Sequence, residues 1–473
     1  MTVQVQEAQI ENIIQQVMAQ LQVNGNQQGA MPRAAQYRGV FPTADEAVRA
    51  AHTALDCFGR VSLTQRKAIV KAMREIAIEN AQKLAQLAYD ETGKGRVSDK
   101  VLKNLLCAEK TPGVEFLPTD AYVGDDGLTL EENAPFGVVL AITPVTNPTS
   151  TIINNAISMV AAGNAVVFAP HPASQKSSLA TMDLLNEAIV GAGGPQNLLV
   201  AVQEASIQVA NELMNHPQIP LICTTGGPAV VTASLSCGKR AIGAAAGNPP
   251  ALVDDTADPQ KAARDIILGH SFDNNMPCTS EKEVIMTSGI ADALMNAFRQ
   301  ADNAHVLDPA LLPQLEAIVL NEKRSGPNPK YIGKNACVML AELGIAADEH
   351  IRAIIVEVDI NHPFVRHEMM MPVLGVVRVR DFEDGVNAAV EVEAGLRHSA
   401  IIHSSNIYHM SEFGRAINTT IFVKNAPSFA GLGFGGEGHT SFTIAGRTGE
   451  GMTTCRTFTR IRRCALVGAF SAV

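Results

Sequence analysis

The sequence predicts an α/β protein built from two units, each with its own parallel sheet. Short apolar runs alternate with amphipathic segments in two successive series, which is typical of parallel strands joined by crossover helices. The chain has 473 residues, too many for one compact core. Hydrophobic residues make up 46% of it and charged residues only 18%, so we expect contacts between subunits to bury further apolar surface.

Residues 1–22 have the pattern of an amphipathic helix. Ile10, Ile14 and Val17 recur at spacings of three and four and define one apolar stripe. Residues 23–36 are rich in Gln, Asn and Gly and predict a flexible linker. A helix tethered in this way is interpreted as a docking peptide for a groove on another protein. The alternative is a frayed terminus or a contact between subunits.

The body of the chain begins with helical patterns at 45–59 and 63–93, each ahead of a glycine. The first alternating series has strand-like runs at 137–145, 165–170, 198–202 and 221–227, and helical patterns at 154–163, 178–193 and 205–216. The second has strand-like runs at 251–255, 283–288, 352–358, 373–379, 400–404 and 421–427, and helical patterns at 291–300 and 385–395. Two further strand-like segments, 128–133 and 456–468, lie outside both series.

Charge and cysteine content exclude several classes of protein. A formal net charge of −10, with no stretch that is both basic and aromatic, has the wrong sign for nucleic acid. The first basic residue is Arg33, which fits neither a secretory signal nor a mitochondrial presequence, and no apolar run is long enough to span a membrane. We therefore expect a cytoplasmic protein. The eight cysteines form no C-x-x-C pair, which argues against disulfides and against a zinc or other metal site.

Two segments carry candidate chemistry. Cys278 follows a polar, proline-containing turn and precedes the strand-like run at 283–288, so its sulfur could lie at a domain edge. A nucleophilic thiol needs exposure and a lowered pKa; a buried structural cysteine is the alternative. Thr225, Gly226 and Gly227 end a strand ahead of a helix, where backbone N–H groups can meet a nucleotide phosphate. Glycines at such a place often only form a turn.

Seven motifs occur in the order found in the aldehyde dehydrogenase superfamily, which the sequence resembles over about residues 37–473. They are NAPFGVVLAITPVTNPTST, AAGNAVVFAPHP, TTGGPAVV, GAAAGNPP, NNMPCTSEKEV, HEMMMPVLGVVRV and FVKNAPSFAGLGFGGEGHTSFTIAGRTGEG. Within the superfamily the sequence is most similar to the coenzyme A-acylating aldehyde dehydrogenases of bacterial microcompartments. The N-terminal helix and linker resemble the encapsulation peptide of such enzymes.

The resemblance implies a covalent mechanism at Cys278. This residue matches the nucleophile that attacks the aldehyde carbonyl to give a thiohemiacetal; hydride then passes to NAD, and the acyl group stays on the enzyme as a thioester. Coenzyme A is the implied acceptor of that acyl group. Glu368 matches the carboxylate that holds the nicotinamide ribose, a sensible acceptor of two hydroxyl hydrogen bonds. Thr225, Gly226 and Gly227 match the stretch that borders the dinucleotide.

Thr143 and Pro144 match the start of a loop that carries an oxyanion-hole amide in relatives. The order here is P-V-T-N-P, so either Thr146 or Asn147 could donate, and Asn147 is preferred on chemical grounds.

Three departures from the superfamily pattern matter. Ala244 stands where hydrolytic relatives carry the Glu that activates water, so we expect a thiol rather than water as the second nucleophile. Ala169 replaces a Lys that such relatives use near the adenosine ribose; nearby His171 either touches the nucleotide or is a surface histidine in a turn. The dinucleotide turn also lacks G-x-G-x-x-G, which predicts looser phosphate binding than in a regular Rossmann site.

These observations predict an NAD-dependent, coenzyme A-acylating dehydrogenase of acetaldehyde or propionaldehyde inside a bacterial microcompartment. The alternatives are a hydrolytic semialdehyde dehydrogenase and a non-catalytic microcompartment-associated protein. The sequence is compatible with either NAD or NADP as the cofactor, and with either a dimer or a tetramer as the oligomeric state.

The resemblance also implies how the chain is divided and what it meets. The cofactor-binding domain would span 37–245 with an oligomerisation strand segment at 118–135, the catalytic domain 246–430, and a return segment with an oligomerisation strand 431–473. Implied partners are the small aldehyde, coenzyme A, further copies of the chain, and shell or cargo proteins reached through the N-terminal helix. Neither nucleic acid nor a membrane is an expected partner.

Overall fold

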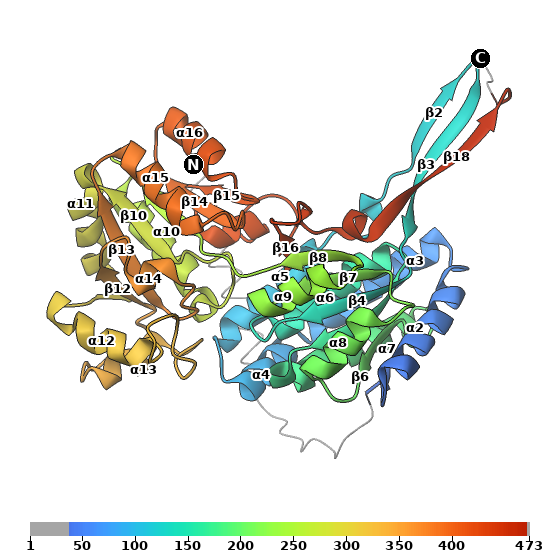
Figure 1. The fold of residues 1–473 in the computed structure, drawn as a ribbon, viewed down its shortest axis with the longest axis horizontal. Coiled ribbons are helices and arrows are strands. Elements are labelled where there is room, and N and C mark those ends of the chain that lie inside the picture. The colour runs from blue at the N-terminus through green and yellow to red at the C-terminus, as the bar shows by residue number, and fades with distance from the viewer. Residues whose placement is uncertain (1–36, 471–473) are drawn as a thin grey trace.

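The computed structural model describes residues 37–470, so the predicted helix at 1–22 and linker at 23–36 lie outside the described residues. Figure 1 shows two α/β lobes and a narrow arm that projects from one of them. Each lobe is built on a parallel sheet, which confirms the predicted fold class. Within 37–470, no helix is both long and apolar enough to cross a membrane.

The first lobe contains a sheet of six parallel strands in the order β1-β6-β5-β4-β7-β8. Their bounds are β1 Val40–Phe41, β4 Val138–Thr143, β5 Ala165–Pro170, β6 Leu199–Val202, β7 Leu221–Thr225 and β8 Arg240–Ala244. Strands β4 and β5 are buried along their whole length, which explains their unbroken apolar sequences. The chain runs outward from β4 through β5 to β6 and returns on the other side of β4 as β7. Ligands of open parallel sheets bind at the carboxyl ends of the strands beside such a reversal.

Helices cover both faces of this sheet. One face is covered by α2 Ala44–Phe58, α8 Ile207–Asn215 and α9 Pro228–Ser236, and the other by α6 Pro148–Ala161 and α7 Gln175–Gly191. Behind the second pair lie α3 Leu63–Glu79, α4 Ala81–Thr92 and α5 Val97–Lys110. Local signals set the helix ends. Ser62 caps α3 by accepting from the backbone N–H of Gln65, and α4 ends at Gly93 with a left-handed φ of 63°.

The second lobe contains seven parallel strands in the order β11-β12-β13-β10-β9-β14-β15. Their bounds are β9 Pro250–Val253, β10 Glu283–Thr287, β11 Ala304–Val306, β12 Ala353–Glu357, β13 Val373–Val379, β14 Ser399–His403 and β15 Ile421–Lys424. Helices α10 Pro259–Ser271 and α11 Ser288–Gln300 cover one face, and α15 Phe382–Glu393 and α16 Ile407–Ile417 the other. Short helices α12 Leu312–Val319, α13 Ala336–Glu342 and α14 Pro363–Arg366 complete the lobe.

The arm is a three-stranded antiparallel sheet in the order β18-β3-β2. It joins β2 Asp120–Gly124 and β3 Gly127–Pro135 to β18 Thr459–Val467 from the other end of the chain (Figure 1). A two-stranded pair, β16 Ile444–Ala445 and β17 Gly451–Met452, lies on the returning segment. Single 3-10 turns are η1 Val114–Phe116, η2 Pro172–Ser174, η3 Phe272–Asn275, η4 Pro309–Leu311, η5 Ser428–Leu432 and η6 Cys455–Phe458.

Candidate active site

The predicted dinucleotide residues follow three neighbouring strands of the first sheet. Thr143 and Pro144 end β4, His171 follows β5, and Thr225 to Gly227 follow β7. The backbone N–H of His171 donates to the carbonyl oxygen of Thr143 over 3.1 Å, which ties two of these ends together. Gly227 is exposed at the N-terminus of α9. The structure therefore places all of them at the carboxyl edge of the sheet, beside the reversal between β4 and β7.

His171 is exposed and caps its own turn. Its Nδ1 accepts from the backbone N–H of Ala173 over 3.1 Å. Partial burial and the nearby ammonium of Lys94 lower its pKa below the usual value. A neutral imidazole thus stands at the edge where the sheet meets solvent.

The segment before Cys278 adopts a rare backbone conformation. Asp273, Asn274 and Asn275 have positive φ values of 47°, 55° and 64°, and all three side chains are buried. Asp and Asn are the residues other than Gly that tolerate this region best. Their side chains hold the turn in place, since Asn274 Nδ2 donates to Asn335 Oδ1 over 2.7 Å and Asn275 Nδ2 donates to the carbonyl oxygen of His270 over 2.8 Å.

Cys278 lies half-buried at the end of this turn, ahead of β10. Burial, with a smaller contribution from the carboxylate of Glu368, raises the pKa of its thiol to about 12 against the opposing effect of Lys282 and Lys103. The lowered pKa expected for a nucleophile is therefore wrong for the chain without ligands. Desolvation outweighs the two ammonium groups, and the thiol is protonated at neutral pH.

Glu368 and Lys282 form the wall beside Cys278. The Nζ of Lys282 lies 3.6 Å from Oε1 of Glu368 and donates to Asn275 Oδ1 over 2.7 Å and to the carbonyl oxygen of Pro277 over 3.2 Å. The backbone N–H of Gly247 also donates to the Glu368 carboxylate. The structure thus brings Glu368 to the nucleophile. It also adds Lys282, which the sequence analysis missed.

His398 is a second residue that the sequence analysis missed. It precedes β14, it is buried, and its Nδ1 lies 2.9 Å from the hydroxyl of Ser399. A Cβ at Gly247 would lie 2.8 Å from both the His398 ring and the carbonyl oxygen of Cys278, so the imidazole lies close to the backbone of Cys278. Burial lowers the pKa of His398 to about 4, and its Nε2 has no hydrogen-bond partner in the described structure.

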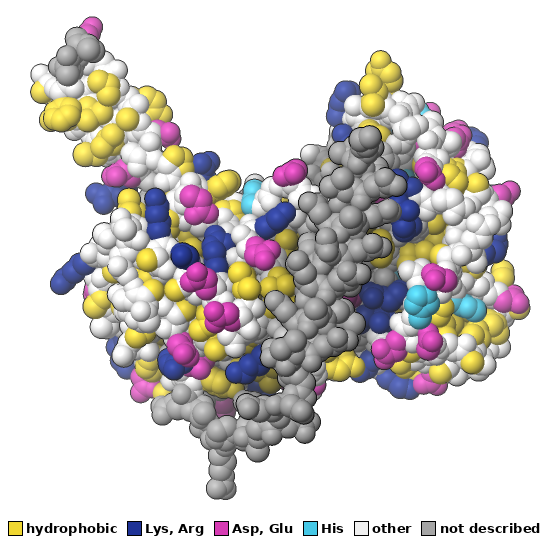
Figure 2. All heavy atoms as spheres, turned by 180° about the vertical axis from the view of Figure 1, so that it is seen from behind, with side chains coloured by type: hydrophobic (Ala, Val, Ile, Leu, Met, Phe, Trp, Pro, Cys, Tyr) yellow, Lys and Arg dark blue, Asp and Glu magenta, His cyan; other side chains and the backbone are white. Residues whose placement is uncertain are grey.

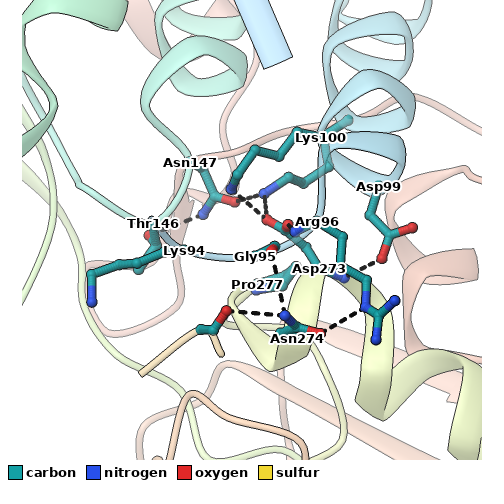
Figure 3. Close-up of polar contacts among 12 residues, drawn as sticks. Lys94, Gly95, Arg96, Asp99, Lys100, Thr146, Asn147, Asp273, Asn274 and Pro277 are labelled. Atoms are coloured by element: carbon teal, nitrogen blue, oxygen red, sulfur yellow. Dashed lines mark hydrogen bonds and ion pairs between the residues drawn. The ribbon is translucent and has the colours of Figure 1, made fainter. Parts of the chain in front are cut away.

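Asn147 is the N-cap residue of α6. Its Oδ1 accepts from Nζ of Lys103 over 2.7 Å, and its Nδ2 lies 3.1 Å from Oγ1 of Thr146. Lys103 also forms an ion pair with Asp273, the first residue of the left-handed turn (Figure 3). One network therefore connects the predicted oxyanion donor to the loop that carries Cys278.

Ala244 is the last residue of β8 and is 3% exposed. It pairs with Thr225 at the carboxyl edge of the sheet. Residues 243–247 read G-A-A-A-G, so this crossing between the lobes contains no ionisable side chain that could deprotonate water.

Comparison with known proteins gives one family and several close relatives. The model of the aldehyde dehydrogenase family matches residues 34–462. The acetylating acetaldehyde dehydrogenase EutE of Salmonella typhimurium is 48% identical over 440 residues, covering 92% of this chain and 94% of that protein.

Two solved structures show the same fold. The crystal structure of Rhodopseudomonas palustris propionaldehyde dehydrogenase with bound CoA and an acylated cysteine has a TM-score of 0.89 and 48% identity, covering 91% of this chain and 98% of that one. A propionaldehyde dehydrogenase from the fucose utilisation microcompartment of Clostridium phytofermentans has a TM-score of 0.90 and 48% identity, covering 92% and 100% of the two chains.

Proposed function

The chain belongs to the aldehyde dehydrogenase family, and on that premise we propose that it oxidises a short-chain aldehyde with NAD and transfers the acyl group to coenzyme A. The observation that carries the proposal is the pairing of Cys278 with a G-A-A-A-G crossing that offers no general base for water. A thiol ionises far more readily than water, so it can take the acyl group without a carboxylate base at that crossing.

The proposed reaction begins at Cys278. Its sulfur bonds to the aldehyde carbon, the thiol proton passes to solvent water, and the amide of Asn147 donates to the oxyanion of the resulting thiohemiacetal. NAD, when bound, would supply the acceptor for the hydride of that carbon. The acyl group then remains on Cys278 as a thioester, and the thiol of coenzyme A displaces the enzyme sulfur to give acyl-CoA.

His398 is the base proposed for the second half of the reaction. Its imidazole is neutral above pH 4, and its free Nε2 can accept the proton that the thiol of coenzyme A loses. Glu368 is proposed to accept hydrogen bonds from the nicotinamide ribose. The backbone at half-buried Gly226 and exposed Gly227 suits a phosphate group at the N-terminus of α9.

Omitting coenzyme A tests the proposed function. Mixing the enzyme with aldehyde and NAD alone should release at most one NADH per active site, and adding coenzyme A should restore steady turnover. Sustained release of free acid without coenzyme A would contradict the acylating reaction and favour a hydrolytic enzyme.

The substrate is proposed to be acetaldehyde or propionaldehyde. One methylene in an apolar pocket changes discrimination by only ~1–3 kcal/mol. A kcat/KM series over two- to five-carbon aldehydes, run with NAD and with NADP, therefore defines both the chain length and the cofactor. No turnover with any short aldehyde would leave only a non-catalytic role.

Residues 1–22 are proposed to direct the enzyme into a microcompartment through shell or cargo proteins. Both sheets and every site residue named above lie within 37–470, so a variant without residues 1–22 should keep its activity. Only packaging should be lost. Aggregation or a several-fold loss of activity would show that the segment belongs to the fold.

The arm is proposed to join copies of the chain. On one of its faces, Val123, Leu128 and Leu466 lie side by side across the three strands, as do Ala121, Leu130 and Cys464. Val123 is 63% exposed and Leu466 47%. Figure 2 shows hydrophobic side chains gathered on the arm. Exposed apolar side chains in contiguous rows are typical of a surface that another protein covers.

A further inference from the structure

Two lysines of α5 bind the same carboxylate but differ in one contact. Lys100 and Lys103 both form ion pairs with Oδ2 of Asp273, and their side chains are 3% and 2% exposed. Only Lys103 also donates to Oδ1 of Asn147, over 2.7 Å. Lys100 is therefore a matched control for Lys103, since both lysines are buried and paired with Asp273 but only Lys103 contacts Asn147.

The contact with Lys103 fixes which way the Asn147 amide points. An ammonium group has three donors and no acceptor, so the group of Asn147 that faces it must be the carbonyl oxygen. The NH₂ group then lies on the side away from the ammonium, where Nδ2 is 3.1 Å from Oγ1 of Thr146. Without this partner the amide could turn over and present an oxygen where a donor is required.

Asp273 in turn fixes the ammonium. Its carboxylate is fully buried and also accepts from the backbone N–H of Arg96 over 2.7 Å. Gly95 makes room for it, because a Cβ at that position would overlap Oδ1 of Asp273. Two ammonium groups share this one carboxylate, and that of Lys103 polarises the Asn147 amide through its hydrogen bond.

We propose that Lys103 is a positioning residue for acylation, which holds the Asn147 amide with its NH₂ group toward the oxyanion of the thiohemiacetal. The proposal rests on the proposed function, because it takes Asn147 as the oxyanion donor. In this role Lys103 acts through Asn147. Its effect should appear in the rate of NADH formation before coenzyme A is added, and not in the affinity for NAD or aldehyde.

The decisive comparison is Lys103→Met against Lys100→Met. Removing one oxyanion donor from an enzyme typically costs ~10²–10³ in rate, so misorienting it should lower the single-turnover rate of NADH formation about 10-fold or more in Lys103→Met, with KM for aldehyde unchanged. Lys100→Met should stay within about 3-fold of wild type. Equal losses in the two variants would overturn the proposal, because they would reflect only the shared contact with Asp273.

A double variant separates this proposal from the proposed function. In an Asn147→Ala background, Lys103→Met should cause no further loss of rate, since nothing remains to be oriented. A further 10-fold loss would overturn the positioning role. If Asn147→Ala alone does not lower the rate of NADH formation, Asn147 is not the oxyanion donor. If Asn147→Ala lowers that rate but Lys103→Met and Lys100→Met lower it equally, only the positioning role of Lys103 is wrong.

A measurement that needs no lysine variant covers the case in which Lys103→Met does not fold. Burial lowers the pKa of Lys103 to about 8, against the opposing effect of Asp273. The charged groups that face its ammonium are Asp273, Lys100 and Asp99, and the titratable thiols of Cys107 and Cys278 are also near.

The ratio of the wild-type rate to the Asn147→Ala rate isolates Lys103. Ionisation of Cys278 affects both enzymes alike and cancels. As pH rises through about 8, Lys103 loses its proton and holds the amide less firmly, so the ratio should fall. A ratio that stays flat from about pH 6.5 to 9.5 would overturn the proposal.

Discussion

The proposed dinucleotide site at the carboxyl edge of the first sheet can be tested by adding a methyl group where the structure leaves room for one. At Gly227 an added Cβ would meet no heavy atom of the described chain within 4 Å, and φ is −65°. Gly227→Ala should therefore fold normally. A phosphate group at the N-terminus of α9 would meet the new methyl group, so KM for NAD should rise several-fold while KM for coenzyme A stays unchanged.

Gly191→Ala is the matched control for that change, since a Cβ at Gly191 of α7 also meets nothing described within 4 Å. It should leave both constants and the melting temperature unchanged. Equal KM values for NAD in Gly227→Ala and wild type would show that the dinucleotide does not approach this turn.

His398 predicts an unusual pH profile for transfer to coenzyme A. Because burial lowers its pKa to about 4, the imidazole can accept a proton throughout the neutral range. The rate of transfer should therefore show no change near pH 6.5, where an ordinary histidine titrates. The rate should fall only as pH falls toward 4. His398→Ala should slow steady turnover about 10²-fold or more and leave the first NADH per site intact; a loss confined to that first NADH would contradict the assignment.

Lys103, which sequence reasoning also missed, has partners that are distant in the chain. Lys103 binds Asn147 and Asp273, which lie 44 and 170 positions away. No local pattern distinguishes it from any other lysine on an amphipathic helix. Cys278 and Glu368 were accessible because each stands inside a recognisable motif, and the lowered pKa expected for Cys278 failed because desolvation depends on packing.

Among the secondary-structure elements, η3 shows how the sequence encodes strain. Asn274 has a φ of 55°, which costs an alanine ~1 kcal/mol or more relative to glycine. Its side chain also accepts from Nε of Arg96 over 2.9 Å and donates to Asn335. Asn274→Gly should lose the side-chain bonds only, whereas Asn274→Ala should lose them and strain the turn.

Urea unfolding of the two variants measures that difference. Asn274→Ala should have a lower free energy of unfolding than Asn274→Gly by about 1 kcal/mol. The opposite order would mean that the turn relaxes out of the left-handed region when its side chain is removed. Near-equal values would place all of the stabilisation in the hydrogen bonds.

The strands that the sequence predicts and those it misses differ in their place in the sheets. Every strand-like run of the two alternating series corresponds to a strand. All of these strands except the edge strand β15 lie inside a sheet, where burial on both faces gives an apolar run. The missed strands β1, β8 and β11 lie at sheet edges. An edge strand needs fewer apolar side chains, so short segments such as R-A-I-G-A do not have the apolar composition that predicts a strand.

At the scale of the whole molecule, the arm carries an apolar face that is exposed in the single chain. Its hydrophobic side chains project away from the lobes (Figure 2). Backbone hydrogen bonds join the three strands of the arm to one another. A second copy can therefore pack on the exposed apolar face, and does not have to pair with the edge of the sheet. Burial of Val123 and Leu466 in such a contact would stabilise the oligomer at about 25 cal/mol per Å² of apolar surface.

A charge placed in those rows should therefore separate the copies. Leu466→Asp puts a carboxylate beside Leu128 and Val123, where burial without a partner costs several kcal/mol. The mass measured by light scattering should fall to that of a smaller assembly at micromolar concentration. Ile407→Asp is the matched control, because Ile407 is 66% exposed on α16 of the second lobe. If Leu466→Asp and Ile407→Asp both keep the wild-type mass, the copies associate through another surface, and the apolar rows of the arm need a different partner.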